Sequence, residues 1–359
     1  GVYVREMPDI ELEMNVVSVT ISVNGRRHTY NNAINKKDFE NLTVYNADFE
    51  NDDFKIEIEY NISLKDSSTV YYTDLETKIN QVNIVPIIGK KKFDTQKLTN
   101  FPINVKPYNA INKTMTTIKT TTTLSFEKAD LNKKGCSIDD LLNNITAYAE
   151  VVSYSTAYST ENGANVYGGV DKDSQPGNLD ISRQNTYEDD SDNANVNCEK
   201  GIRTISGIVF EDNATGEIGA GKQRLGNGQY DENENKIKDV KVQLQIINGD
   251  KSETIKTTTT NDDGTFEITD FVAGRYKLVY TWGEDSKYNV VDYKSTIWSK
   301  DNKNSKNNND NGKDKDKWYT KTEPRYSDAL DDWDTRTKRD KDNSTEKPTT
   351  MDATTYDME

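Results

Sequence analysis

Strict alternation of apolar and polar side chains over residues 54–64 constrains the fold of this chain more than any other feature. Successive side chains of a β-strand point to opposite faces of its sheet, so a period-two pattern puts all the apolar residues on one face. The pattern recurs at residues 17–23, where Asn24 and Gly25 supply a turn signal. An amphipathic helix would need apolar residues three and four positions apart, so both segments are predicted to be half-buried strands. Further strands are expected over residues 81–88, 116–126 and 145–154.

The segments between these strands are clusters of Asn, Asp, Gly and Lys, which are typical of turns. One short helix is predicted at residues 138–142, with Ser137 as its N-cap. Several short strands separated by turns indicate an antiparallel β-sandwich, and we assign residues 1–155 to an N-terminal β-sandwich. This architecture does not assign a function, because sandwiches serve adhesion, carbohydrate binding and spacing alike.

Residues 156–200 lose the alternation and are predicted to be an acidic connector. Acidic clusters occur in it at residues 171–173 and 188–192. Their carboxylates are hard oxygen ligands that suit a metal at a domain junction. Acidic stretches are usually solvated, however, and a connector is the favoured interpretation.

Alternation returns after residue 200. Strands are predicted at residues 205–210, 240–246, 254–260, 266–268 and 276–282, with a long polar loop after the first. This order predicts a second antiparallel sandwich over residues 201–299. Residues 300–317 consist almost wholly of Lys, Asn and Asp and are predicted to be a flexible linker. Residues 318–359 are expected to be a mostly disordered or docking tail.

The 359 residues carry 46 Lys and Arg against 61 Asp and Glu, which gives a formal net charge of -15. Such a surface repels phosphate backbones and anionic lipids, so no nucleic acid partner is expected, whereas divalent cations are attracted. No run of about 18 apolar residues occurs, so no membrane insertion is expected in this segment. The chain starts without a signal peptide and ends without a wall-sorting motif, and we interpret it as an internal fragment or processed form of a longer protein.

Residues suited to catalysis are scarce in the sequence. His28 is the single histidine and follows a turn, and no nucleophile stands beside a base. We therefore expect that the chain is not an enzyme and has no catalytic residues. Cys136 and Cys198 lie far apart without a CxxC spacing, which excludes a zinc or redox motif and leaves their pairing open.

Four ordered motifs between residues 205 and 282 resemble the Cna-B and serine-aspartate-repeat B-type (SdrD B-like) modules of Gram-positive, clostridial-type surface adhesins and pilin-like proteins. The motifs are an opening strand with its terminal acid at residues 206–212, an NGxxDxxE loop at 227–234, the following strand at 240–244, and a TxxDGxYxF-like signature at 259–268. Four motifs in one order are more specific than any single one.

The resemblance implies an all-β chain of tandem antiparallel β-sandwich modules, Ig-like or prealbumin-like, joined by polar linkers. It also implies a Ca2+ site in the loop after the first strand. The side-chain ligands implied there are Asp212, Asn227, Asp231 and Glu234. Calcium takes about six to eight oxygen ligands, and loop carbonyls or water would complete the shell. The alternative is a solvated acidic loop in which Lys222 and Arg224 neutralise the carboxylates.

The implied function is that of an extracellular structural or adhesive module at the cell surface or cell wall. It would serve as a calcium-rigidified spacer or as a fibre-forming subunit of a filament or pilus. The expected partners are neighbouring domains or copies of the same surface protein, with a host matrix protein or glycan as a further option. Two alternatives stay open. One is a carbohydrate-binding module that uses exposed aromatics such as Tyr71, Tyr72 or Trp318, and the other is a non-catalytic domain of a secreted enzyme.

Overall fold

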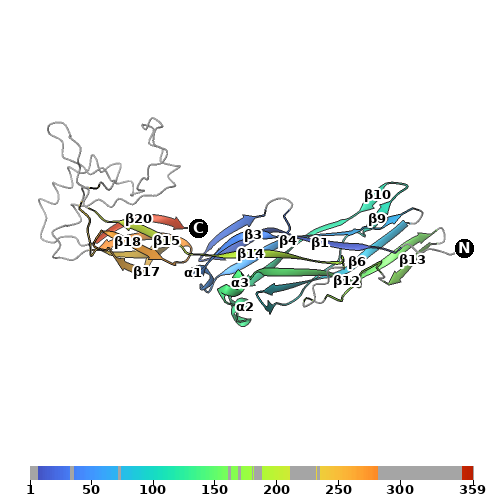
Figure 1. The fold of residues 1–359 in the computed structure, drawn as a ribbon, viewed down its shortest axis with the longest axis horizontal. Coiled ribbons are helices and arrows are strands. Elements are labelled where there is room, and N and C mark those ends of the chain that lie inside the picture. The colour runs from blue at the N-terminus through green and yellow to red at the C-terminus, as the bar shows by residue number, and fades with distance from the viewer. Residues whose placement is uncertain are drawn as a thin grey trace, which may run out of the picture. The chain divides into compact units, whose positions relative to one another are not determined.

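The computed structural model describes residues 7–32, 36–71, 74–160, 163–168, 171–179, 181, 188–210, 232, 235–281 and 350–358 (Figure 1). The chain divides into two units, Gly1–Gly201 and Ile202–Glu359. Both are built mainly of antiparallel strands, which confirms the predicted all-β class. The longest described helix has six residues, and none of the described helices is long and apolar enough to cross a membrane.

One sheet of the N-terminal unit is four-stranded and antiparallel. Its order is β11 (Ile118–Glu127), β4 (Lys55–Asp66), β1 (Ile10–Val23) and β2 (Arg26–Asn31). β1 and β2 form a hairpin through Asn24 and Gly25, which both have a positive φ as the turn signal predicts. β4 carries the long alternation and is hydrogen-bonded to β1 on one side and to β11 on the other.

The second sheet of this unit has the order β3 (Phe39–Tyr45), β14 (Ser191–Gly201), β12 (Ile145–Thr160), β6 (Asp74–Ile88) and β7 (Lys91–Lys92). β13 (Gly163–Gly168) also pairs with β12, and β8 (Gln96–Thr99) pairs with β6. β14 runs parallel to β3 and antiparallel to β12. A small separate sheet consists of β10 (Thr114–Thr116), β9 (Lys106–Asn109) and β5 (Thr69–Val70).

Burial in the N-terminal unit follows the alternation in the sequence. In β4, every second side chain from Ile56 to Leu64 is fully buried, and the polar side chains between them are partly exposed. The second sheet contributes Val82, Ile84 and Ala147, which are also fully buried. Because β1 contacts both β14 and β12, the apolar core lies between the two sheets.

The acidic connector predicted over residues 156–200 is corrected by the structure. β12 continues to Thr160, β13 returns along it, and β14 runs through the second sheet to Gly201. The strand signal of β14 is weak because Asn fills its outward positions, while the inward Ala194 and Val196 are small and fully buried. The N-terminal unit therefore extends to Gly201.

The predicted helix at residues 138–142 is confirmed as α3 (Ile138–Leu142). The backbone N–H of Ser137 donates to Asp140 Oδ2 over 2.8 Å as part of a capping box. Two further short helices, α1 (Asn46–Phe49) and α2 (Lys128–Lys133), contact β3 and β11 respectively. Cys136 and Cys198 are both free thiols.

The C-terminal unit has two sheets among its described residues. β15 (Thr204–Ile208) pairs with β18 (Thr265–Thr269). The other sheet has the order β17 (Lys251–Thr259), β16 (Lys241–Asn248), β19 (Gly274–Thr281) and β20 (Thr350–Met358). The five strands predicted between residues 205 and 282 are thus confirmed. Their core includes the buried side chains of Val242, Leu244, Phe266, Tyr276 and Leu278.

β20 belongs to the segment that was expected to be a disordered or docking tail. It pairs antiparallel with β19 at the edge of the sheet. Its Thr- and Asp-rich composition resembles a solvated tail, so only the pairing with β19 identifies it as a strand. The predicted linker at residues 300–317 lies outside the described residues.

Candidate functional site

The four calcium ligands implied for the C-terminal unit, Asp212, Asn227, Asp231 and Glu234, lie outside the described residues. The calcium site in that loop therefore stays a prediction. The structure brings carboxylates together in a different place, inside the N-terminal unit.

Three carboxylates of the N-terminal unit converge on one point. Oxygen atoms of Asp9, Asp171 and Asp173 all lie within 4.8 Å of one another. Asp9 directly precedes β1, and the other two lie in the segment between β13 and β14. Asp9 and Asp171 are buried, whereas Asp173 is exposed at the rim. Together with the neighbouring Asp66, Asp189 and Asp190, these residues are called the acidic centre below.

Backbone hydrogen bonds hold the acidic centre in place. The N–H of Lys172 donates to the carbonyl of Pro8 over 3.0 Å, which ties the segment between β13 and β14 to the start of β1. The N–H of Leu12 donates to the carbonyl of Asp189 over 2.7 Å, and that of Val151 donates to the carbonyl of Asp190 over 3.0 Å. The residues before β14 thus lie between β1 and β12.

Side-chain hydrogen bonds orient several of the carboxylates. Asp171 Oδ2 accepts the N–H of Ile10 over 3.0 Å, and Asp66 Oδ1 accepts the N–H of Asp9 over 3.1 Å. The hydroxyl of Ser174 donates to Asp189 Oδ1 over 3.0 Å. These hydrogen bonds hold residues from the start of the N-terminal unit close to residues from the segment before β14.

Several oxygens on the inner side of the centre have no hydrogen-bond partner. Asp190 is 0% exposed, and neither of its carboxylate oxygens is partnered. Asp66 is also 0% exposed, with Oδ2 unpartnered, and Asp9 Oδ1 is buried and unpartnered. Buried polar atoms are nearly always satisfied in folded proteins, so this arrangement calls for a ligand or a proton.

A further group of oxygens adjoins Asp190. The Nδ2 of Asn178 donates to Glu188 Oε1 over 2.9 Å, while its own Oδ1 is buried and unpartnered. Glu150, 6% exposed, accepts the N–H of Leu179 over 2.7 Å. Carboxylates and an amide carbonyl are hard oxygen donors, the class that calcium and magnesium select.

Burial, followed by the crowding of negative charge, raises the pKa of Asp171 and Asp190. Burial, followed by the charges of Glu150 and Glu188, raises the pKa of Asp190 to about 7. Burial, together with the charges of Asp189 and Asp9, raises the pKa of Asp171 to about 6. Burial and the charges of Asp171 and Asp190 also raise the pKa of Tyr154. Losing a carboxyl proton is therefore unfavourable unless a cation replaces it.

The N-terminal unit, kept in chelator, should lose stability as the pH rises from about 5 to about 7. A carboxyl group whose folded pKa is raised stabilises fully below its unfolded pKa, and this contribution is lost as the pH passes its folded pKa. For Asp171 and Asp190 that window runs from the ordinary 3.8 to about 6 and about 7. The groups facing them, Glu150, Glu188 and Asp189, carry the same charge, and Lys172 is the cation paired with Asp9 at 3.2 Å.

Calorimetry in chelator should show a melting temperature several degrees lower at the higher pH. The double variant Asp171→Asn/Asp190→Asn removes both titrating groups and should lose this difference. Equal melting temperatures of the unsubstituted protein at the two pH values would contradict the prediction.

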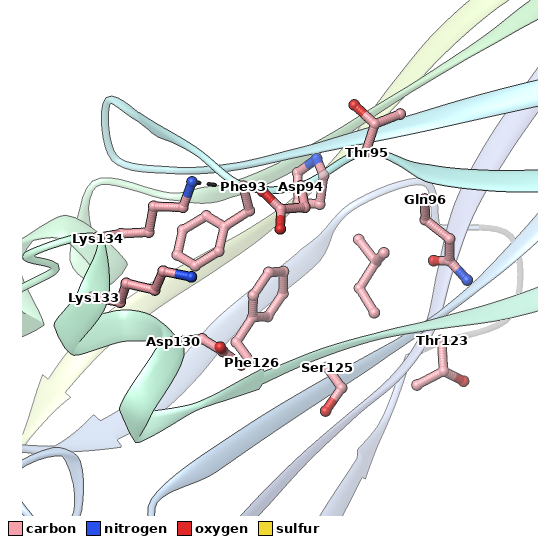
Figure 2. Close-up of a pocket in the computed structure, with 12 residues that line it drawn as sticks. Phe93, Asp94, Thr95, Gln96, Thr123, Ser125, Phe126, Asp130, Lys133 and Lys134 are labelled. Atoms are coloured by element: carbon pink, nitrogen blue, oxygen red, sulfur yellow. Dashed lines mark ion pairs between the residues drawn. The ribbon is translucent and has the colours of Figure 1, made fainter.

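A groove of about 400 Å3 lies elsewhere on the N-terminal unit, between the segment before β8 and the edge strand β11 (Figure 2). The rings of Phe93 and Phe126 pack edge to face in it, with centroids 5.1 Å apart. On its rim, Lys134 pairs with the fully exposed Asp94 over 3.7 Å. The charged side chains around this groove are exposed to solvent, so the acidic centre is the better candidate site.

The structure describes one of the aromatic residues considered for glycan binding. Tyr71 is 54% exposed, and Tyr72 and Trp318 lie outside the described residues.

Sequence reasoning singled out the acidic clusters at residues 171–173 and 188–192 but missed Asp9, Asp66 and Glu150. A signal for Asp66 exists, because it occupies the next inward position after Leu64 in the alternation of β4. A carboxylate at an inward position of a strand is unusual and marks a buried polar site. Asp9 and Glu150 have no such local signal.

Comparison with known proteins bears on the C-terminal unit. Residues 222–332 match the family model of the SdrD B-like domain, which confirms the resemblance found in the sequence. The match includes strands β16 to β19, and Asn227, Asp231 and Glu234 fall inside it. No curated protein matches the chain.

Solved structures give weaker similarities. The major pilin subunit BcpA of Bacillus cereus aligns at 11% identity over 82% of this chain and 64% of that chain, with a TM-score of 0.23. The group B streptococcus pilus 2b backbone protein aligns at 14% identity over 63% of this chain and 79% of that chain, with a TM-score of 0.18. The chain thus spans less than two thirds of the length of BcpA, and at these TM-scores the alignments carry no argument about function.

Proposed function

From the SdrD B-like domain in its C-terminal unit, we propose that this chain is a structural module of a bacterial cell-surface protein. In this role its β-units act as a spacer or as part of a fibre, outside the cell and without catalysing a reaction. Its partners are neighbouring domains or further copies of the same surface protein.

The family match is the observation that carries this proposal. It agrees with four ordered motifs in the sequence and with the strands that the structure places there. The construction of the N-terminal unit is compatible with a spacer, because its strands are long. β1, β6 and β12 have 14, 15 and 16 residues, and long ladders of backbone hydrogen bonds stiffen a unit along its strands.

Calcium at the loop of the C-terminal unit would rigidify this spacer. The proposal rests on the implied ligands Asp212, Asn227, Asp231 and Glu234 and on the match to the SdrD B-like domain, which begins at residue 222 and includes the last three of them. Tryptophan fluorescence can test it in the full chain. All four tryptophans (Trp282, Trp298, Trp318 and Trp333) belong to the chain segment of the C-terminal unit, so any change in their fluorescence comes from that part of the chain.

We expect about 1 mM calcium to raise the tryptophan-monitored melting temperature by several degrees relative to chelator, because a ligand that binds only the folded state stabilises it by RT ln(1 + [L]/Kd). The double variant Asp231→Asn/Glu234→Gln should lose this response. Its matched control is Asp250→Asn/Glu253→Gln, two exposed acids with the same spacing. Identical melts of the unsubstituted protein in calcium and in chelator would refute the calcium-rigidified spacer.

A further inference from the structure

We propose that the acidic centre of the N-terminal unit binds a calcium ion, and that this ion clips the two sheets of the unit together. The inference is independent of the calcium loop of the C-terminal unit, since it rests on residues of the other unit.

The first argument is convergence. Asp9, Asp171 and Asp173 come from distant parts of the chain, yet their ligand oxygens lie within 4.8 Å of one another. Like charges so close repel one another in the absence of a cation. Lys172 Nζ approaches Asp9 Oδ2 over 3.2 Å, but its side chain is 63% exposed, so it neutralises the rim rather than the interior.

The second argument is the unpartnered oxygen atoms. Both carboxylate oxygens of Asp190 and one of Asp66 are buried, and none of the three accepts a hydrogen bond from the described residues. Asp189, next to Asp190, is hydrogen-bonded to Ser174 in the same segment as Asp171 and Asp173. The charges of Asp171 and Asp189 act on Asp190, so its unpartnered oxygens adjoin the converging trio. A cation bound at the trio would neutralise Asp9 and Asp171 directly and would offset the buried negative charge of the adjoining Asp66 and Asp190.

The chemistry of the donors selects calcium. The centre offers carboxylate oxygens from more than one side, and calcium takes about six to eight oxygens in a flexible geometry. Magnesium demands a strict octahedron and keeps several of its waters, which a crowded set of inward carboxylates does not accommodate. The trio contains only carboxylates, whereas structural zinc prefers thiolate and imidazole.

The position of the centre determines what the ion would do. Asp9 and Asp66 belong to the sheet of β1 and β4, since one precedes β1 and the other ends β4. Asp190 precedes β14 in the opposite sheet, and Asp171 and Asp173 belong to the segment that leads into it. One ion would therefore join the first strand of the unit to its last strand. That junction resists the separation of the two sheets.

Hydrogen exchange of the full chain tests this inference. The background is Asp231→Asn/Glu234→Gln, which removes the implied ligands of the C-terminal loop, so failure there and failure here are separable. We expect about 1 mM calcium chloride to slow exchange about tenfold or more in residues 8–14, 63–68 and 188–192 relative to chelator, and magnesium chloride to have little effect.

Two variants and one control complete the test. Asp190→Asn should abolish the calcium response but fold in chelator at least as well as the parent, because it removes a buried unpaired charge. Asp173→Asn, at the exposed rim, should leave folding unchanged and weaken calcium affinity about tenfold. Asp94→Asn, fully exposed in the groove of Figure 2, should change neither. Equal exchange in calcium and chelator, or a full calcium response in both Asp190→Asn and Asp173→Asn, would overturn the proposal.

Discussion

Replacing Gly264 with alanine should strongly destabilise the C-terminal unit. Gly264 has a φ of +72°, a backbone conformation that side chains disfavour by about 1–2 kcal/mol. A Cβ atom there would also lie 2.6 Å from the carbonyl oxygen of Val209 and 3.1 Å from Lys236 Cβ. The first of these distances is far below van der Waals contact, and the atom approached belongs to the backbone.

The backbone around Gly264 has little freedom to move away. The N–H of Val209 donates to the carbonyl of Gly264 over 2.9 Å, and the N–H of Ile237 donates to the carbonyl of Val209 over 2.9 Å. Three chain segments are thus held against one another at this glycine. Relieving the clash would break these bonds, so we expect a total loss of about 3–5 kcal/mol.

Gly249 provides the matched control for Gly264. Its φ of +62° is similar, but a Cβ atom there meets nothing within 4 Å. Gly249→Ala should therefore cost only the conformational term, about 1 kcal/mol. In tryptophan-monitored melts, Gly264→Ala should lower the melting temperature by about 10 °C or more, and Gly249→Ala by a few degrees. Equal shifts for the two variants would show that the close approach does not matter.

The second large effect is expected at the centre of the N-terminal core. Ile58 is 0% exposed in β4, with Val19 of β1 and Leu124 of β11 as its pairing partners on either side. Ile58→Ala removes three buried carbon atoms from between these strands and leaves a cavity that the flanking ladders keep from collapsing. Such substitutions cost about 2–5 kcal/mol, and we expect a value near the middle of this range.

Glu57 is the control for Ile58, because it is the neighbouring residue on the opposite face of the same strand. It pairs with Lys55 over 3.0 Å and with Arg27 over 3.5 Å. Partly exposed ion pairs of this kind contribute about 1 kcal/mol or less, so Glu57→Ala should have a small effect. Calorimetry of the full chain should show the transition of the N-terminal unit lowered by about 10 °C for Ile58→Ala and by about 2 °C or less for Glu57→Ala. A comparable shift for both would mean that β4 does not form the core.

The strands that sequence reasoning found share one property. β1, β4, β11 and the five strands β15 to β19 carry apolar residues at every second position or lie next to a clear turn signal. Both signals are local, so a single stretch of sequence suffices to read them. The motifs that resemble the SdrD B-like domain could also be recognised from the sequence, because each is short and local and they follow one another in a fixed order.

The candidate site shows the opposite case. The side chain of Asp171 accepts a hydrogen bond from the backbone N–H of Ile10, 161 positions away in the sequence. Nothing in the sequence of either segment predicts this contact. The acidic stretches at residues 171–173 and 188–192 were noted as oxygen-rich, yet the same composition describes a solvated linker. A metal site and a solvated linker differ in whether the carboxylates are buried. These carboxylates are buried only because β14 is paired within the sheet.

Sequence by itself thus determined that the chain is all-β, where most strands run, and that residues 205–282 resemble a B-type module. Only the tertiary structure decided that β14 lies between β3 and β12, that β20 completes the sheet beside β19, and that Asp9, Asp171 and Asp173 meet. The physical reason is that side-chain alternation follows from the geometry of a single strand. Strand order and the burial of a charge depend instead on which distant strands pair, and that choice is made by the core as a whole.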